Sequence, residues 1–374
     1  MKKLMVIPLV AAGMAAMVGC SKTPVKEAAK NDAINLANLD TAVAPGTDFY
    51  QYACGGWMKN NPLKPEYARF GTFDQLRDNN QEQIRTLIEG LSETPGQEGS
   101  VGQKIGMLFA MGMDSVKLNE DGYAPIKDQL AEINKLGTKD ELTKMVATLH
   151  KEGMAPFFAL YVGADEKNSS MNIVQLYQAG LGMGDRDYYL LEDESSQKMR
   201  EAYKNYITRL FTLIGCSPEQ ADAAVNAIMK IERGIAEVSF SREDLRDSQK
   251  NYNKMSIEDF KAKNDLLNWD VYFESMGMMD IKYLDAKQLS FYEGLSALMK
   301  NTTLDEQKYY LTFNLLSSAA PYLSDPFVAA DFDFYGKTMS GRQEQQPRWK
   351  RALSTVNGCL LYTSPSPATT LHLV

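Results

Sequence analysis

The sequence predicts a mainly α-helical protein with one small β-hairpin inserted in it. Over most of the chain, apolar residues recur at spacings of three and four, and in one short interval they alternate with polar residues instead. Helical spacing predicts amphipathic helices, whereas alternation predicts strands with one buried face. Of the 374 residues 44% are hydrophobic and 24% are charged, which is ordinary for a globular protein and sufficient for a substantial core.

The N-terminus predicts export. Two lysines precede an apolar run at residues 4–18, which is too short to span a bilayer comfortably and is followed by Cys20 and a polar stretch. This pattern resembles a bacterial lipoprotein signal in which the cysteine carries the lipid. We therefore expect a signal peptide over 1–20, lipidation at Cys20, a flexible tether over 21–40, and a protein anchored to the bacterial cell envelope, on its periplasmic or outer-membrane face. A plain secretory signal with a chance cysteine is the alternative.

Helical patterns begin after the tether. The first helix is marked by apolar residues at positions 73, 76, 84, 87, 88 and 91. Thr138 precedes Glu141 by three residues, which is a capping box, and Ser217 precedes Pro218, which is an N-cap followed by proline at the first helical position. Helices are predicted over about 102–117, 122–136, 138–151, 196–214, 217–238, 285–300 and 303–320. Residues 41–358 are thus interpreted as one helical unit.

One interval departs from the helical spacing of apolar residues. Residues 156–164 are rich in Phe, Leu, Tyr and Val, residues 165–170 are polar, and residues 171–177 alternate again, which predicts a β-hairpin. The glycines at 180, 182 and 184 could suggest a phosphate-binding loop, but the segment neither ends in Gly-Lys-Ser/Thr nor opens an evident helix. We interpret it as a turn.

The residues that could carry chemistry are few. His150 and His372 are the only two histidines in the sequence, and neither lies in His-Glu-x-x-His, where two imidazoles one helical turn apart bind zinc. We interpret His150 as a histidine near the negative end of a helix dipole. Asp185 and Asp187 flank Arg186, and we interpret them as a local ion-pair network rather than a catalytic carboxylate pair.

The spacing of the cysteines and the distribution of charge exclude further classes of functional site. Cys20, Cys54, Cys216 and Cys359 form no C-x-x-C pair, which excludes a zinc ribbon or a thioredoxin-like site. With Cys20 assigned to lipid an odd number remains, so at least one thiol should be free or lack its partner. The chain carries 40 basic and 48 acidic residues without a dense basic cluster, so we expect no nucleic-acid partner.

The segment 359–374 departs from the preceding pattern. Its run of Ser and Pro abandons helical periodicity and has no core-facing stripe. Read back through the genetic code, residues 359–367 are compatible with an adapter used in sequencing libraries. We therefore expect this tail not to be native to the protein.

Five separated blocks of the sequence stand out, at residues 48–57, 69–77, 184–190, 251–255 and 332–351. In this order they resemble the neprilysin and endothelin-converting-enzyme family of zinc metalloendopeptidases. In that family the N-terminal half forms most of a multi-helix domain that caps a thermolysin-like domain and encloses a cavity for peptides. The resemblance therefore implies that residues 41–358 are a neprilysin-like N-terminal cap domain.

The same resemblance implies proteolysis of oligopeptides by zinc-activated water. The family's His-Glu-x-x-His, its downstream Glu-x-x-x-Asp and its Asn-Ala-Tyr/Phe motif do not occur in this sequence, so no catalytic residue or zinc ligand can be assigned to it. We expect an N-terminal fragment of an exported zinc metalloendopeptidase that is inactive alone and binds no zinc, while the full-length enzyme does. The alternative is a noncatalytic lipoprotein binding module.

Two arginines match substrate-binding positions of the family. Arg69 and Arg77 correspond to a pair eight residues apart, of which the first approaches the C-terminal carboxylate of a short substrate and the second supports it. A guanidinium can bind a carboxylate through two parallel hydrogen bonds. The alternative is two solvated arginines at the start of a helix. Cys54 matches a cysteine whose disulfide partner, in vertebrate members, lies in the half that this chain lacks.

Overall fold

The computed structural model describes residues 35–94 and 96–363, with side chains described up to residue 359. The chain divides into two compact units, Met1–Pro62 and Leu63–Val374. In its described part, the first unit contains a short 3₁₀ turn, η1 (Leu36–Asn38), and helix α1 (Phe49–Asn60), which Asp48 caps by accepting a hydrogen bond from the Gln51 amide. The predicted signal peptide, Cys20 and most of the tether lie outside the described residues.

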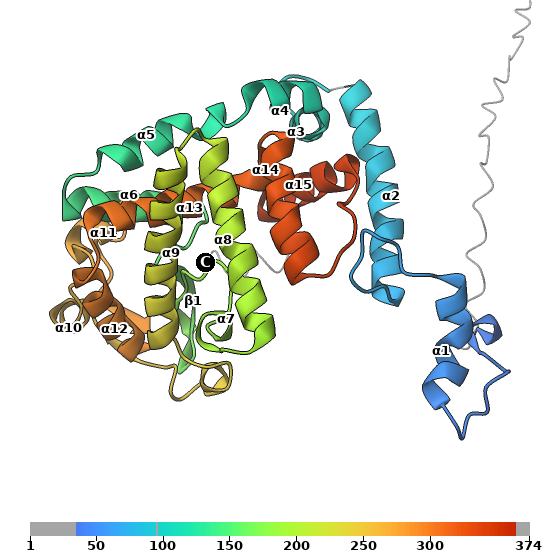
Figure 1. Ribbon diagram of the computed structural model, residues 1–374, viewed down its shortest axis with the longest axis horizontal. Helices are drawn as coiled ribbons and strands as arrows, with labels where there is room; N and C mark the ends of the chain where they lie inside the picture. Colours follow the sequence, from blue (N-terminus) through green and yellow to red (C-terminus); the bar gives the residue numbers. More distant parts are fainter. Residues whose placement is uncertain (1–34, 95, 364–374) are drawn as a thin grey trace, which may run out of the picture. The chain divides into compact units, whose positions relative to one another are not determined.

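The second unit is mainly helical, which confirms the predicted class (Figure 1). Its helices are α2 (Thr72–Glu93), α3 (Val101–Met113), α4 (Ser115–Asp121), α5 (Lys127–Lys135), α6 (Lys139–Lys151), α7 (Asp187–Leu190), α8 (Glu194–Leu213), α9 (Pro218–Val238), α10 (Ile257–Lys263), α11 (Trp269–Met276), α12 (Leu289–Lys300), α13 (Leu304–Ala319), α14 (Asp325–Asp331) and α15 (Arg348–Thr363). Short 3₁₀ turns join several of them, and a π-helical segment, η5 (Phe332–Met339), follows α14.

Local signals placed several helix starts correctly. Thr138 and Glu141 form the predicted capping box of α6, and Ser217 caps α9 with Pro218 at its first position. The helix predicted over 102–117 is instead two helices, because Asp114 ends α3 and its carboxylate caps α4. Such a cap redirects the chain because it satisfies the amides of a new helix start.

The predicted hairpin is confirmed, and it belongs to a larger sheet than expected. β1 (Phe158–Asp165) and β2 (Asn168–Gln178) pair antiparallel, β2 pairs parallel with β4 (Tyr283–Ala286), and β4 pairs antiparallel with β3 (Lys254–Ser256). The strand order is β1-β2-β4-β3. The helix predicted over 285–300 therefore begins later, at Leu289, because its first residues belong to β4. Strands this short carry no readable alternation.

Two hydrophobic cores hold the second unit together. The larger core lies among α8, α9, α13 and the sheet and contains many pairs of aromatic rings, such as the stacked Tyr206 and Phe334, whose centroids are 5.4 Å apart. The smaller core joins α2, α3 and α15 through Ile88, Phe109 and Leu353. It brings together segments from opposite ends of the chain.

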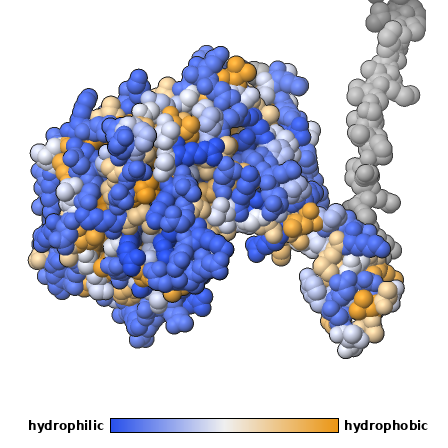
Figure 2. Space-filling model, in the orientation of Figure 1, coloured by the Kyte–Doolittle hydropathy of each residue, from blue (hydrophilic) through white to orange (hydrophobic). Residues whose placement is uncertain are grey.

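The apolar stripe of α2 is only partly buried. Ile88 lies in the smaller core, whereas Phe73 is 88% exposed and Leu87 is 68% exposed. The helix was predicted correctly, but within the described residues its apolar packing partners lie in α3 and α15. The face shown in Figure 2 is otherwise mostly hydrophilic, with scattered apolar residues.

The C-terminal helix α15 continues to Thr363, past the point where the pattern was expected to break. Residues 359–363 are therefore helical, which corrects the expectation that periodicity ends at residue 358; the first proline of the segment comes only at residue 365, and no residue before it prevents helix formation. The remainder of the segment lies outside the described residues. No helix in the described part of the chain has the length and apolar character that a membrane crossing requires.

Candidate functional site

The two predicted substrate-binding arginines lie at the start of α2. Arg69 is exposed, and within the described residues its guanidinium forms no ion pair or hydrogen bond. Arg77, also exposed, pairs with Asp74, with 2.6 Å between Nη2 and Oδ1. The other oxygen of Asp74 accepts a hydrogen bond from the Gly71 amide at 2.9 Å, so Arg77 supports the start of the helix. Of the two guanidinium groups, that of Arg69 is the one without a charged partner among the described residues.

A buried cluster of charged side chains around Asp78 holds the segment that carries Arg69. Asp78 accepts hydrogen bonds at 2.8 Å from both Lys64 and Lys350, and the Tyr67 hydroxyl also donates to it. Burial by itself would raise the pKa of Asp78, but the hydrogen bonds from Lys350, Lys64 and Tyr67 lower it to about 2. Lys350 belongs to α15, so the cluster ties the C-terminal helix to the segment that carries Arg69.

Backbone contacts reinforce the same attachment. The Pro65 carbonyl accepts hydrogen bonds from the amides of Gln343 and Glu344 at 2.9 and 3.0 Å. The Arg85 guanidinium lies 4.6 Å from the centre of the Trp349 ring, which is a cation–π contact between α2 and α15. Sequence reasoning missed these partners because nothing local connects residues so far apart in the chain. The Arg69 segment is therefore held on a rigid base.

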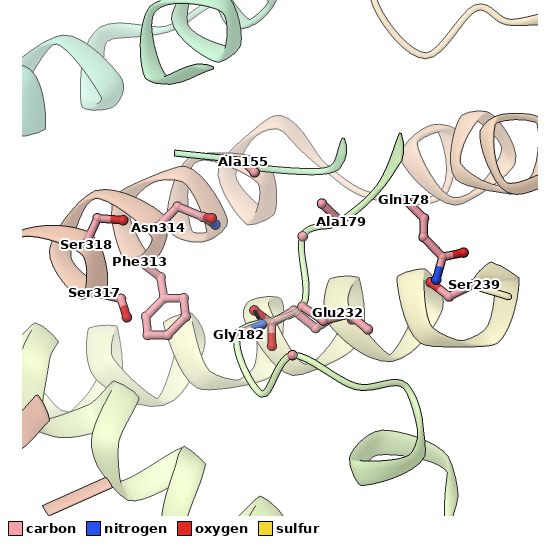
Figure 3. Close-up of a pocket in the computed structure, with 13 residues that line it drawn as sticks. Ala155, Gln178, Ala179, Gly182, Glu232, Ser239, Phe313, Asn314, Ser317 and Ser318 are labelled. Carbon is pink, nitrogen blue, oxygen red and sulfur yellow. Dashed lines mark hydrogen bonds between the residues drawn. The ribbon is translucent and has the colours of Figure 1, made fainter. Parts of the chain in front are cut away.

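A second polar centre lies in a cavity of about 420 Å³ formed by the glycine-containing turn, α9 and α13 (Figure 3). Glu232 of α9 points toward Gly182, and its carboxylate accepts hydrogen bonds from Tyr189 at 2.6 Å, Tyr203 at 3.0 Å and the Gly182 amide at 3.3 Å. Burial raises the pKa of Glu232 to about 7, and these hydrogen bonds from neutral groups oppose the rise only in part.

The glycines of the turn serve packing. A Cβ at Gly182 would lie 1.8 Å from the Tyr203 hydroxyl. Gly180 has φ +94°, and a Cβ there would lie 2.9 Å from the Phe157 amide nitrogen. Because the Gly182 amide donates to a carboxylate of the same chain, it is not part of a phosphate cradle. The predicted turn is confirmed.

The charged segment after the turn forms a local network, as predicted. Asp185 pairs with Arg242, and Arg186 donates to the Ser239 carbonyl at the end of α9. The Asp187 amide donates to Asp185 at 2.8 Å. Asp185 and Arg186 therefore fasten the turn to the segment at and after the end of α9, and the two aspartates are not arranged as a catalytic carboxylate pair.

His150 lies in the last turn of α6, but burial rather than the helix dipole governs it. Its Nε2 donates to the Pro156 carbonyl at 3.2 Å, so its Nδ1 accepts from the Tyr272 hydroxyl at 2.6 Å. Burial lowers the pKa of His150 to about 4. Its position near the C-terminal end of a helix is as predicted, and its ring is neutral with both nitrogens hydrogen-bonded.

The described residues offer no donor set for a metal. Nowhere in residues 35–94 and 96–363 do three His, Cys, Asp or Glu side chains gather closely enough to hold an ion. Cys54 and Cys216 are free thiols as far as the described chain extends. Burial raises the pKa of Cys216, which disfavours its reactive thiolate. His372 lies outside the described residues.

Comparison with known proteins agrees with this architecture. The chain is 29% identical to mouse (Mus musculus) endothelin-converting enzyme 1 over 379 residues, which covers 94% of this chain and 48% of the mouse protein. It is 27% identical to neprilysin-11 of Caenorhabditis elegans, over 84% of this chain and 39% of that relative. The chain thus spans about half the length of the curated relatives it matches or less.

A solved structure agrees as well. The Mycobacterium tuberculosis zinc metalloprotease Zmp1, solved in complex with an inhibitor, superimposes with a TM-score of 0.81 and 27% identity, over 87% of this chain and 50% of that one. The family model described as peptidase family M13, in its N-terminal part, matches residues 45–363. A match over most of the chain, together with the shared fold, shows that this chain belongs to peptidase family M13.

Proposed function

We propose that this chain is the N-terminal half of an exported zinc metalloendopeptidase that hydrolyses oligopeptides, and that it has no peptidase activity alone. The observation that carries the proposal is the family match over residues 45–363 in a chain that spans about half of its relatives. The described residues do not fit a zinc ion, so we assign the metal to the part of the full-length protein that this sequence does not contain.

Within that enzyme, Arg69 binds the free C-terminal carboxylate of the substrate. Its exposed guanidinium on a segment clamped by Lys350 and Asp78 supports this role, because a rigid base limits the entropy lost on binding. Arg77, already paired with Asp74, orients the start of α2.

The test uses a full-length version and a short peptide as the free acid and as its C-terminal amide. Arg69→Ala should raise KM for the free acid roughly tenfold to a hundredfold with little change in kcat, because a charge-assisted hydrogen bond made equally in ground and transition states is lost. Arg69→Lys should restore this only in part, and Arg77→Ala is the matched comparison. Equal losses on acid and amide would assign Arg69 to the fold instead.

The location of the protein is proposed from its N-terminus alone. An apolar run that ends at Cys20 supports lipidation of that cysteine and attachment to the cell envelope. Cys20→Ser should move the protein from the membrane to the soluble exported fraction. Unchanged fractionation would contradict lipid anchoring.

A noncatalytic lipoprotein binding module is the second candidate, favoured by the lack of a zinc donor set in the described residues. The exposed Phe73 and Leu87 on α2 argue against it, because a free-standing module would leave this apolar surface uncovered. The gene decides between the two: an in-frame His-Glu-x-x-His downstream of codon 358 supports the peptidase, and a genuine stop codon supports the module. For this chain alone we expect less than one zinc per molecule after mild chelation.

A further inference from the structure

The cavity beside Glu232 contains a buried acid that no cation in the described chain balances. Glu232 is 1% exposed, and the partners that act on its carboxylate, Tyr189, Tyr203 and the Gly182 amide, are all neutral. Among the described residues that line the cavity, Glu232 carries the only charged side chain. Buried carboxylates are usually paired with a cation, because a lone charge is costly to remove from water. The site therefore lacks a positive partner.

The other titratable groups near Glu232 cannot supply that positive charge. Four tyrosines, from α7, α8, α13 and η5, interact electrostatically with its carboxylate, and burial raises the pKa of each above its usual value of 10: Tyr189, Tyr203, Tyr310 and Tyr335. All four are therefore neutral near pH 7. A balancing cation has to come from outside the described chain.

Two unusual backbone features adjoin the walls of the same cavity. Phe157, which is fully buried, has φ +66°, in the region that favours glycine, and its amide donates to the Tyr310 hydroxyl. That hydroxyl donates to the Gly180 carbonyl of the cavity wall at 2.7 Å. From the π-helical segment η5, Tyr335 donates to the Gly182 carbonyl at 3.0 Å. Strained residues and π-helical segments occur often at binding sites, so their place here supports a binding role for the cavity.

The remaining walls suit a small organic molecule with hydrogen-bonding groups. The volume of about 420 Å³ exceeds the roughly 150 Å³ that holds benzene, so the cavity has room for more than a single ion. Asn314, Ser317 and Ser318 line it from one face of α13, whereas Glu232 lines it from α9 (Figure 3). Asn314 donates to the Tyr310 carbonyl at 2.9 Å, and its side-chain oxygen remains able to accept a hydrogen bond.

We propose that this cavity binds a small primary amine in its protonated form, with the ammonium on the Glu232 carboxylate and a polar body against α13. A carboxylate has about four acceptor positions, and Tyr189, Tyr203 and the Gly182 amide use three of them, which leaves one for the ammonium.

Two observations select an amine over other cations. Nowhere in the described residues do three His, Cys, Asp or Glu side chains gather to hold a metal ion, whereas an ammonium needs only one carboxylate. A zwitterionic amino acid fits less well, because none of the described lining residues is a cation that could pair with its carboxylate. The inference goes beyond the proposed peptidase function and does not depend on it.

The experiment titrates the chain with ethanolamine by calorimetry at pH 8 in an amine-free buffer. The comparison ligands are 1-propanol, in which a methyl replaces the ammonium, and glycine, which adds a carboxylate. Saturable binding of ethanolamine is expected, at least about tenfold tighter than that of either comparison ligand. Because burial raises the pKa of Glu232 to about 7, lowering the pH to 5.5 should weaken binding roughly thirtyfold, while ethanolamine stays protonated and the four tyrosines stay neutral.

Three variants locate the site. Glu232→Gln keeps the shape of the side chain and should abolish the preference for ethanolamine over 1-propanol. Glu237→Gln removes an exposed carboxylate of the same helix and, as the matched control, should bind like the wild type. Ser318→Phe guards against misfolding of the first variant: Ser318 is exposed, so the fold should remain intact while the ring obstructs the cavity and weakens binding at least about tenfold.

Several outcomes would overturn the proposal. They are the absence of saturable binding, equal binding of ethanolamine and 1-propanol, a preference that persists in Glu232→Gln, binding that is no weaker at pH 5.5, and displacement of ethanolamine by an equal concentration of KCl. Because the readout is binding by this chain, it does not depend on whether a full-length version cleaves peptides.

Discussion

Asp78 and Glu232 are both buried carboxylates that accept three or more hydrogen bonds, yet their pKa values shift in opposite directions. Asp78 faces two ammonium groups, and its pKa falls to about 2. Glu232 faces two tyrosine hydroxyls and one backbone amide, and its pKa rises to about 7. The comparison teaches that the charge of the partners, and not the number of hydrogen bonds, decides whether a buried acid stays ionised.

The two centres therefore respond to opposite ends of the pH range. A lowered pKa means that Asp78 contributes about 2 kcal/mol of stability above its ordinary pKa of 3.8, which is lost as the pH falls toward 2. A raised pKa means that ionising Glu232 costs stability as the pH rises from 4.5 to about 7, by about 3 kcal/mol in total. With respect to these two groups, stability is greatest near pH 4 to 5.

Removing the buried cation should have the largest effect. Lys350→Met leaves Asp78 buried with a single ammonium partner and should lower the free energy of unfolding by about 3–5 kcal/mol. The control is Lys64→Met, which removes the half-exposed partner of the same carboxylate and should cost about 1 kcal/mol or less. Urea unfolding at pH 7 measures both. Equal losses would mean that burial of the lysine does not matter.

The dependence of stability on pH tests the raised pKa of Glu232. Glu232→Gln keeps the side-chain shape without an ionisable group, so the loss of about 3 kcal/mol expected between pH 4.5 and 8 in the wild type should largely disappear. Glu237→Gln, on the exposed face of the same helix, should retain the wild-type profile. An unchanged slope in Glu232→Gln would place the titrating group elsewhere.

Exposed arginines should show the smallest effects. Arg77→Ala should lower the free energy of unfolding by about 0.5 kcal/mol, because it loses an exposed pair with Asp74. Arg69→Ala should change it by less, since within the described residues the guanidinium has no partner. Thermal or urea unfolding of the two variants side by side checks this. A loss above about 1 kcal/mol for Arg69→Ala would indicate a structural role and weaken its assignment to substrate.

Prediction from sequence succeeded where the signal is local. Thr138, Ser217 and the hairpin were identified because caps, proline and alternation act over a few residues. The candidate site was harder to predict from the sequence. Arg69 and Arg77 were identified only through the family resemblance, because no local sequence pattern distinguishes a functional exposed arginine from any other. The short strands β3 and β4 were missed because a strand of three or four residues has no period.

The sequence by itself determined the helical class, the capped starts of α6 and α9, the turn after β2 and the family blocks, since each depends on neighbouring residues or on a recognisable order of motifs. Only the tertiary structure decided the ionisation of Asp78 and Glu232 and the neutral state of His150. The physical reason is distance along the chain: Asp78 meets Lys350 across 272 residues, and a pKa depends on burial and partners that only folding brings together.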